Sequence, residues 1–292
     1  MSEPLLLSIG QCATLACLLE ATAPKVGNVH RGADFEDLSF LDFEVSAAVI
    51  GPIVERAAEA GVGRTVFDAV RATRHWTATN SNLGMILLLA PLAAVPRDAA
   101  LDAGVQAVLE SLAPDDARLV YEAIRHAQPG GLGQADQMDV ADEPPASLLD
   151  AMRAAADRDL IARQYANGFR QVFDDVVPWL ADDWCGTSEI TTARLPLTDR
   201  IIHAQLNVLA KHPDSLIARK CGPHVAEQSS ARAARTLAAG PPTSPDYLWA
   251  LDDFDFWLRS DGHRRNPGTT ADLIAAGLFM VLRDQRVQPP FR

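Results

Sequence analysis

Apolar residues recur at alternating spacings of three and four along most of the chain, which is the period of an amphipathic helix. The pattern is clearest after Ser39, a candidate helix cap, where it runs through Phe40, Phe43, Ala47, Ile50, Val54 and Ala57. Pro52 is expected to kink that helix. Similar patterns predict further helices at residues 5–19, 64–77, 83–94, 98–111, 114–127, 147–180, 189–210, 222–238, 246–259 and 270–284. Because β-branched residues rarely cluster, the predicted fold class is all-α.

Residues 128–145 (QPGGLGQADQMDVADEPP) interrupt this pattern with glycines, prolines and acids, and they predict a long loop. The chain has 292 residues, of which 48% are hydrophobic, so it can bury a large core. We expect one all-α domain over 1–292, with lobes at 1–127 and 146–292 that the loop would join. No repeat is visible.

Charge and cysteine content exclude several classes of function. A formal net charge of −12 opposes nucleic-acid binding, because phosphate neutralisation requires a surplus of Lys and Arg. The four cysteines form no CxxC pair, so neither a disulfide framework nor a zinc site is expected at Cys12, Cys17, Cys185 and Cys221. The first helix lacks the basic flank of a secretion signal, and the longest apolar run, 83–95, is too short to span a bilayer. A cytoplasmic location without membrane contact is expected, and a homodimer is left open.

The segment 23–35 (APKVGNVHRGADF) lacks an apolar period and concentrates polar residues between two glycines. Lys25 and Arg31 could neutralise phosphate oxygens, with Asn28 and His30 as neighbours, and Asp34 could bind magnesium. A polar connector with solvated charges explains the same composition, and composition alone favours the connector.

A second polar block lies around residue 80. Arg74 ends a helical face that it shares with Arg71 and His75, and T-A-T-N-S-N-L-G follows and opens the next helix. A helix N-terminus offers unpaired N–H groups to a phosphate, so Asn80 and Asn82 are candidate ligands. A simple N-cap at Ser81 or Asn82 is an equally good interpretation.

Asp159 falls in the apolar stripe of the predicted helix 147–180, where a buried carboxylate needs a partner. Metal coordination or a catalytic role, with Asp157 nearby, competes with an ion pair to Arg163 or to another helix, and the ion pair is favoured. The loop acids Asp136 and Asp139 could complete a magnesium site.

Residues 266–272 (NPGTTAD) read as a turn that enters a helix, preceded by Arg264 and Arg265. Thr269 and Asp272 have the spacing of a variant capping box, although threonine hydroxyls at a helix N-terminus also suit an anion. His203 and His212 lack the spacing of metal ligands. The chain has no G-x-S-x-G, GxGxxG or Walker loop.

Three blocks together resemble the triphosphoribosyl-dephospho-CoA synthase family: EATAPKVGNVH at 20–30, TNSNLG at 79–84 and NPGTTADL at 266–273. The resemblance implies an all-helical transferase in which the 2′-hydroxyl of dephospho-CoA attacks C1′ of ATP and expels adenine, with Mg²⁺ present. It assigns phosphate contacts to Lys25, Arg31, Asn80 and Asn82. It further assigns Mg²⁺ or catalytic roles to Asp34 with Asp159 or Asp139, and support of the ribose pocket to Asp272.

The sequence also departs from the family pattern. Val26 stands where the family has a second proline, TNSNLG stands where N-T-H-K-G is usual, and the H-R-G-G block is missing. In its place is PDSLIARK at 213–220, which adds Arg219 and Lys220 as candidate phosphate ligands. This pattern resembles the divergent branch of methanogens and of bacteria with methanopterin-dependent one-carbon metabolism. An enzyme of pterin or methanofuran assembly is therefore one alternative. A non-catalytic helical adaptor that binds partner proteins through its acidic surface is the other.

Overall fold

The computed structural model describes residues 6–129, 138–181, 195–242 and 244–291. Within them the chain is almost entirely helical, as predicted, with one short extended segment, β1 (Ser260–His263). The helices are α1 (Ile9–Thr22), α2 (Phe40–Val54), α3 (Ala57–Ala60), α4 (Val62–Thr77), α5 (Leu83–Ala93), α6 (Leu101–Glu110), α7 (Pro114–Ala127), α8 (Leu148–Ala155), α9 (Leu160–Asn167), the π-helix η1 (Val172–Val176), α10 (Val177–Leu180), α11 (Leu197–Lys211), α12 (Ser215–Cys221), α13 (Pro223–Ala238), α14 (Pro245–Arg259) and α15 (Gly268–Arg283). None of the helices in these ranges is long and apolar enough to cross a membrane.

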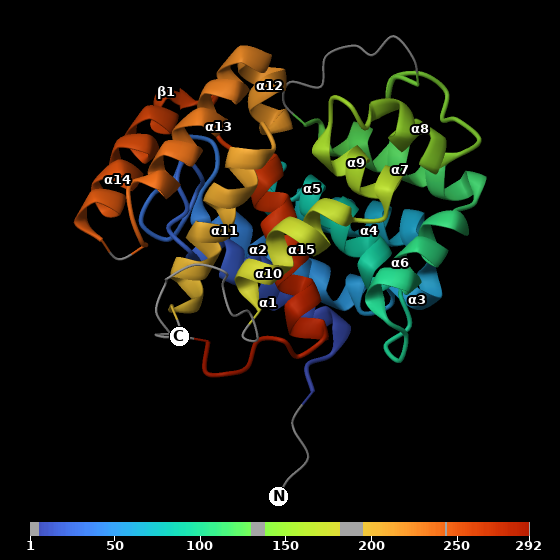
Figure 1. The fold of residues 1–292 in the computed structure, drawn as a ribbon. Coiled ribbons are helices and arrows are strands. Elements are labelled where there is room, and N and C mark those ends of the chain that lie inside the picture. Colours follow the sequence, from blue (N-terminus) through green and yellow to red (C-terminus); the bar gives the residue numbers. More distant parts are fainter. Residues whose placement is uncertain (1–5, 130–137, 182–194, 243, 292) are drawn as a thin grey trace, which may run out of the picture.

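Helix α15 runs through the middle of the molecule, although it is the last helix of the chain (Figure 1). It packs against α1 and α5, and nearly all of its residues are buried. Its apolar residues belong to the same core cluster as those of α1, α2, α4, α5 and α7. The predicted lobes 1–127 and 146–292 therefore share a core.

A second, smaller core cluster lies among α11, α12, α13 and α14, on the other side of α15 from α7, α8 and α9 (Figure 1). Val26, from the segment that follows α1, is buried in this cluster together with Leu206, Phe254 and Leu258. The segment after α1 is thus held by the C-terminal helices.

The predicted long helix at 147–180 is wrong. The chain forms α8, turns at residues 156–159 and restarts as α9, which ends at Gly168 in the left-handed conformation (φ +70°). Asp159 is the N-cap of α9 and does not lie within a helical stripe. The apolar period continues across the turn because both short helices bury one face, so periodicity alone did not reveal the break.

Most other boundaries were predicted to within a few residues. Ser39 caps α2 in a capping box with Asp42, and Pro52 lies inside α2 shortly before the helix ends. The first helix begins later than predicted, and the start of the predicted helix 189–210 lies partly outside the described residues. Helix α12 was not predicted as a helix.

Candidate functional site

A cavity of about 620 Å³ opens between the α5 and α15 N-termini, with α8, α9 and α12 as its other walls. Many of the residues singled out in the sequence line it: Asn28, Arg74, Asn80, Asn82, Asp139, Asp159, Arg219, Lys220, Thr269 and Asp272. Segments far apart in the chain therefore meet in one cavity.

The first turn of α5 lines the cavity and leaves polar atoms without partners. Asn82 occupies the N-cap position, but its side chain makes no cap hydrogen bond; Asn80 Oδ1 accepts from the Leu83 N–H at 3.1 Å instead. The Asn82 Nδ2 and Ser81 Oγ atoms are buried and lack hydrogen-bond partners. Because such groups are costly to bury unsatisfied, they indicate a polar ligand at this wall.

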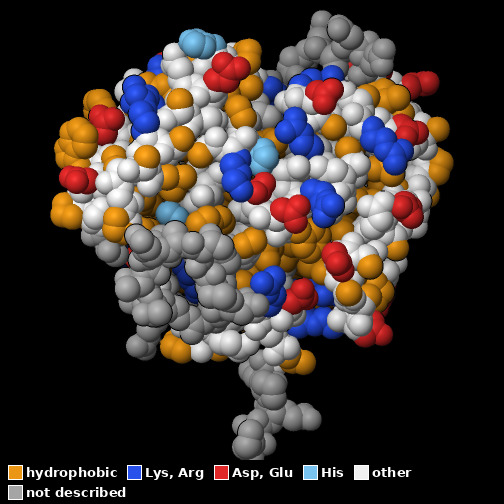
Figure 2. Space-filling model, viewed as in Figure 1, with side chains coloured by type: hydrophobic (Ala, Val, Ile, Leu, Met, Phe, Trp, Pro, Cys, Tyr) orange, Lys and Arg blue, Asp and Glu red, His pale blue; other side chains and the backbone are white. Residues whose placement is uncertain are grey.

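Cationic side chains from three elements line the cavity. Arg74 reaches it from the end of α4, where its guanidinium donates to the Ala78 carbonyl at 2.7 Å. Lys220 and Arg219 come from the last turn of α12, and Arg158 precedes α9. In Figure 2 basic and acidic side chains alternate across the face that is shown.

Asp214 joins the N-termini of α12 and α15. Its Oδ1 accepts from the N–H groups of Leu216 (2.8 Å) and Ile217 (3.0 Å), and its Oδ2 accepts from the N–H (2.7 Å) and hydroxyl (2.8 Å) of Thr270. The carboxylate is fully buried, and burial raises its pKa. The capping box predicted for Thr269 and Asp272 is therefore wrong, because α15 is capped by a residue from another helix.

Asp272 does not cap α15. It lies one turn into that helix and lines the cavity. Its carboxyl group has no hydrogen-bond or ion-pair partner among the described residues. It rests against Gly84: a Cβ atom at that position would lie 1.9 Å from Asp272 Oδ2. Burial raises the pKa of the carboxyl well above its usual value, and the nearby Glu20 and Asp214 raise it further.

Asp159 is engaged through both oxygens. Oδ1 accepts from the N–H groups of Ile161 (2.8 Å) and Ala162 (3.1 Å), while Oδ2 forms an ion pair with Arg219. Arg163 turns instead to the carbonyls of Ala156 and Asp157. The ion pair to another helix, favoured from the sequence, is the one that forms, and it ties α9 to α12.

Lys25 is not among the residues that line the cavity. Its side chain is fully buried, and its ammonium pairs with Glu20 Oε1 at 2.8 Å and donates to the Glu20 carbonyl at 2.5 Å. A third contact goes to the Ala23 carbonyl at 3.5 Å. Its three N–H groups are therefore used within the protein, whereas Glu20 itself lines the cavity.

The rest of segment 23–35 is bonded to the C-terminal helices. The Gln205 side chain accepts a hydrogen bond from the Val26 N–H and donates to the Val26 carbonyl and to Asn28 Oδ1. The Asn28 amide donates to Asn266 Oδ1 at 2.6 Å. Gly27 has φ +70°, and its N–H donates to Asp255 at 2.7 Å. A Cβ at Gly27 would meet Leu258 at 2.7 Å, which explains glycine at this close approach.

Three other candidates of this segment do not line the cavity. His30 Nδ1 accepts from the Gly32 N–H at 3.1 Å, and burial lowers its pKa. Arg31 is exposed. Asp34 accepts from the Phe40 N–H at 2.6 Å and so serves the start of α2.

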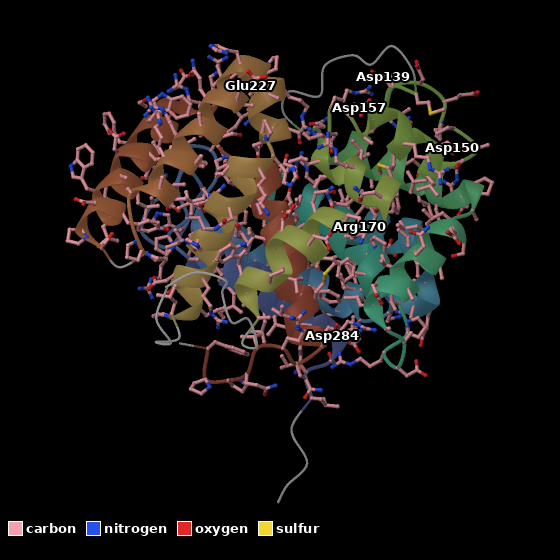
Figure 3. All side chains as sticks on the ribbon, viewed as in Figure 1. Asp139, Asp150, Asp157, Arg170, Glu227 and Asp284 are labelled. Carbon is pink, nitrogen blue, oxygen red and sulfur yellow. The ribbon has the colours of Figure 1, made fainter. Side chains whose placement is uncertain are left out.

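Asp139 lies in the described part of the predicted loop, which α7 holds in place. The Tyr121 hydroxyl donates to the Met138 carbonyl at 2.9 Å, and Arg125 donates to the Val140 carbonyl at 3.0 Å. Figure 3 shows Asp139 and Asp157 at the α8 and α9 side of the molecule. Within the described ranges no three His, Cys, Asp or Glu side chains form a metal cluster. Asp136 lies outside these ranges.

Three of the four cysteines and the buried His203 lie among the described residues. Cys12, Cys17 and Cys221 are free thiols, and Cys185 lies outside the described residues. His203 is buried against Trp179, at 4.7 Å between ring centroids, and burial lowers its pKa to about 4.

Three functional features were missed from the sequence. Gly84 and Asp214 each contact a residue far along the chain, whereas Glu20 pairs with Lys25 across the turn that ends α1. Only Asp214 had a local signal, since an Asp-Ser pair before an apolar run is typical of a helix N-terminus.

Comparison with known proteins identifies a family and similar solved structures. The profile of a family described as ATP:dephospho-CoA triphosphoribosyl transferase matches residues 7–290. A crystal structure from Archaeoglobus fulgidus, titled as that of a triphosphoribosyl-dephospho-CoA synthase, is 25% identical, with a TM-score of 0.62. The match covers 83% of this chain and 99% of that one. No curated protein matches the sequence.

Proposed function

The chain belongs to the ATP:dephospho-CoA triphosphoribosyl transferase family, and we propose that its cavity transfers the triphosphoribosyl group of ATP to an acceptor hydroxyl with release of adenine. The observation that supports this is the meeting of the three family-like blocks, 20–30, 79–84 and 266–273, around one cavity. Dephospho-CoA is the proposed acceptor, and the 2′-hydroxyl is its proposed nucleophile.

The polar wall at the start of α5 is the proposed triphosphate site. Asn82 and Ser81 present unsatisfied atoms there, and the helix N-terminus favours negative charge. Arg74, from the helix that precedes this wall, and Lys220, from α12, also line the cavity. These cations would neutralise phosphate oxygens of ATP and of the acceptor.

The apolar part of the cavity is the proposed adenine site. Leu83, Leu87, Ile161 and Ala162 line it, from two helices that pack against each other. An apolar slot with few polar groups suits a purine, and it excludes water that would otherwise compete with the acceptor hydroxyl.

Magnesium is proposed to enter with the nucleotide. Mg²⁺ is usually held by one or two carboxylates together with substrate phosphates. Three acids were predicted to bind it, and Asp34 does not line the cavity. Asp159 lines it, but its oxygens accept from backbone N–H groups and pair with Arg219. Asp139 also lines it. Asp139 is therefore the proposed contact. The ion would neutralise the triphosphate.

The test is adenine release. Incubation with ATP, Mg²⁺ and dephospho-CoA should yield free adenine and a product heavier than dephospho-CoA by a triphosphoribosyl unit, measured by chromatography and mass spectrometry. Arg74→Ala should raise KM for ATP about tenfold, the size of one charged hydrogen bond. An unchanged KM would contradict the proposed phosphate site, and no adenine release would contradict the function.

The sequence departures at 26 and 79–84 motivate a second acceptor. In that alternative the same transfer from ATP serves a phosphorylated precursor of a pterin or methanofuran cofactor. Adenine release with such an acceptor, and not with dephospho-CoA, distinguishes the two.

A further inference from the structure

Asp272 differs in its surroundings from Glu20 and Asp159, which line the same cavity, and from the nearby Asp214. Glu20 pairs with Lys25, Asp159 pairs with Arg219, and the buried Asp214 is saturated by N–H and hydroxyl donors. Asp272 has no such partner within the described residues, although it lines the cavity. A partly buried carboxyl group without a donor or a cation favours its neutral form.

The Asp272 carboxyl group packs directly against Gly84 of α5. Glycine at position 84 leaves room that any Cβ would fill, and the adjacent cavity wall carries Leu83 and Leu87 from α5. The proposed adenine site and the Asp272 carboxyl group therefore lie against the same turn of α5. From this position we expect the carboxyl group to reach a ring nitrogen of the base.

The proposed reaction requires such an acid. Adenine is a poor leaving group as an anion and a good one when a ring nitrogen is protonated. We propose that Asp272 is the catalytic residue that donates this proton to the leaving adenine. The inference rests on the proposed function, since it presumes that the bond between C1′ and the base is broken.

The proton and electron balance is as follows. The C1′–N9 bond breaks, and its electron pair stays with the purine, which takes the Asp272 proton at N7 or N3. The acceptor hydroxyl bonds to C1′ and loses its proton to water. That proton balances the one Asp272 gives up, and solvent restores the acid after adenine leaves.

Two other roles for Asp272 need the opposite protonation state. A contact to a ribose hydroxyl or to Mg²⁺ requires the carboxylate, so activity would increase as pH rises through its pKa. A proton donor is active below that pKa, which burial and the neighbouring acids raise, and activity is lost as pH rises through it. The charged groups that act on Asp272 are Glu20, Asp214, Arg219 and Asp159, and the thiol of Cys17 lies on the facing helix.

The experiment compares Asp272→Asn on two substrates, ATP and ATP methylated at N7. The methylated base is already cationic and leaves without a proton donor. Asp272→Asn should lower kcat on ATP by about 10²–10⁴-fold, the usual contribution of a general acid, and should change kcat on the methylated substrate little. The wild-type decline in kcat at high pH should disappear in the variant.

Asp139→Asn is the matched control, a carboxylate-to-amide change in the same cavity that should affect both substrates alike. The fold is checked by thermal melting: because the Asp272 pKa is raised in the folded state, its ionisation destabilises the wild type as pH rises, so Asp272→Asn should melt higher at alkaline pH. Equal losses on both substrates, or activity that rises with pH, would overturn the proposal. A wild type that releases no adenine from ATP would instead remove the proposed function, and this proposal with it.

Discussion

Glu20 and Asp272 are two acids that line the same cavity from neighbouring helices, and their surroundings differ completely. Glu20 is paired with a buried ammonium at 2.8 Å, so its charge is neutralised within the protein. Asp272 faces the cavity with no partner among the described residues. The pairing of Glu20 indicates a structural role, and the unpaired carboxyl of Asp272 at the cavity wall is the basis of its proposed catalytic role.

The same contrast separates two segments that contact these residues, the segment 23–35 through Lys25 and the start of α5 through Gly84. Segment 23–35 is rich in charge, but its polar atoms bond to α11, α14 and the entry to α15. The start of α5 carries less charge, but it leaves Asn82 and Ser81 unsatisfied at the cavity wall. Charge in the sequence favours the first segment as the phosphate site, whereas the unsatisfied atoms are the reason that we propose the second.

The largest expected effect comes from breaking the buried ion pair. Lys25→Met keeps the volume of the side chain but leaves Glu20 buried without its cation, and it should lower the free energy of unfolding by about 3–5 kcal/mol. Denaturant unfolding followed by circular dichroism measures this loss. Lys25→Met with Glu20→Gln is the control and should recover part of it, because no unpaired charge remains. A single variant as stable as the wild type but with a raised KM for ATP would show that Lys25 binds phosphate after all.

The fold class and most helices followed from the sequence because each helix buries one face, and that requirement is written in local periodicity. The break at 156–159 did not follow, since α8 and α9 each continue the apolar period. The cap of α15 did not follow either, because Asp214 lies more than fifty residues before Thr270.

The sequence predicted which segments meet at the candidate site. It did not predict which residues of those segments line the cavity. Asn82, Arg74 and Asp272 were chosen from residue type and position, and they line the cavity. Lys25 was chosen on the same grounds and does not, because a buried partner five residues earlier cannot be recognised without the turn that joins them.

An intermediate effect is expected from Gly84→Ala, which tests the seat of Asp272. In an isolated helix this change would stabilise by up to about 1 kcal/mol. Here the new methyl group would collide with Asp272, which should cost about 1–3 kcal/mol and reverse the sign. Combining it with Asp272→Ala removes the collision and should restore the gain. A stabilised single variant would mean that Asp272 does not rest on Gly84.

The smallest effect is expected from Arg31→Ala, which distinguishes the two interpretations of segment 23–35. If the segment wraps the triphosphate, as the family resemblance implies, removing this cation should raise KM for ATP about tenfold, as predicted for Arg74→Ala. The structure leaves Arg31 exposed and away from the cavity lining, so KM should not change and stability should vary by less than about 0.5 kcal/mol. Steady-state kinetics on the two arginine variants, prepared together, measure both outcomes. A rise in KM for Arg31→Ala alone would reverse the comparison, because the phosphate chain would then lie over the first segment and the unsatisfied atoms at Asn82 would serve another part of the substrate.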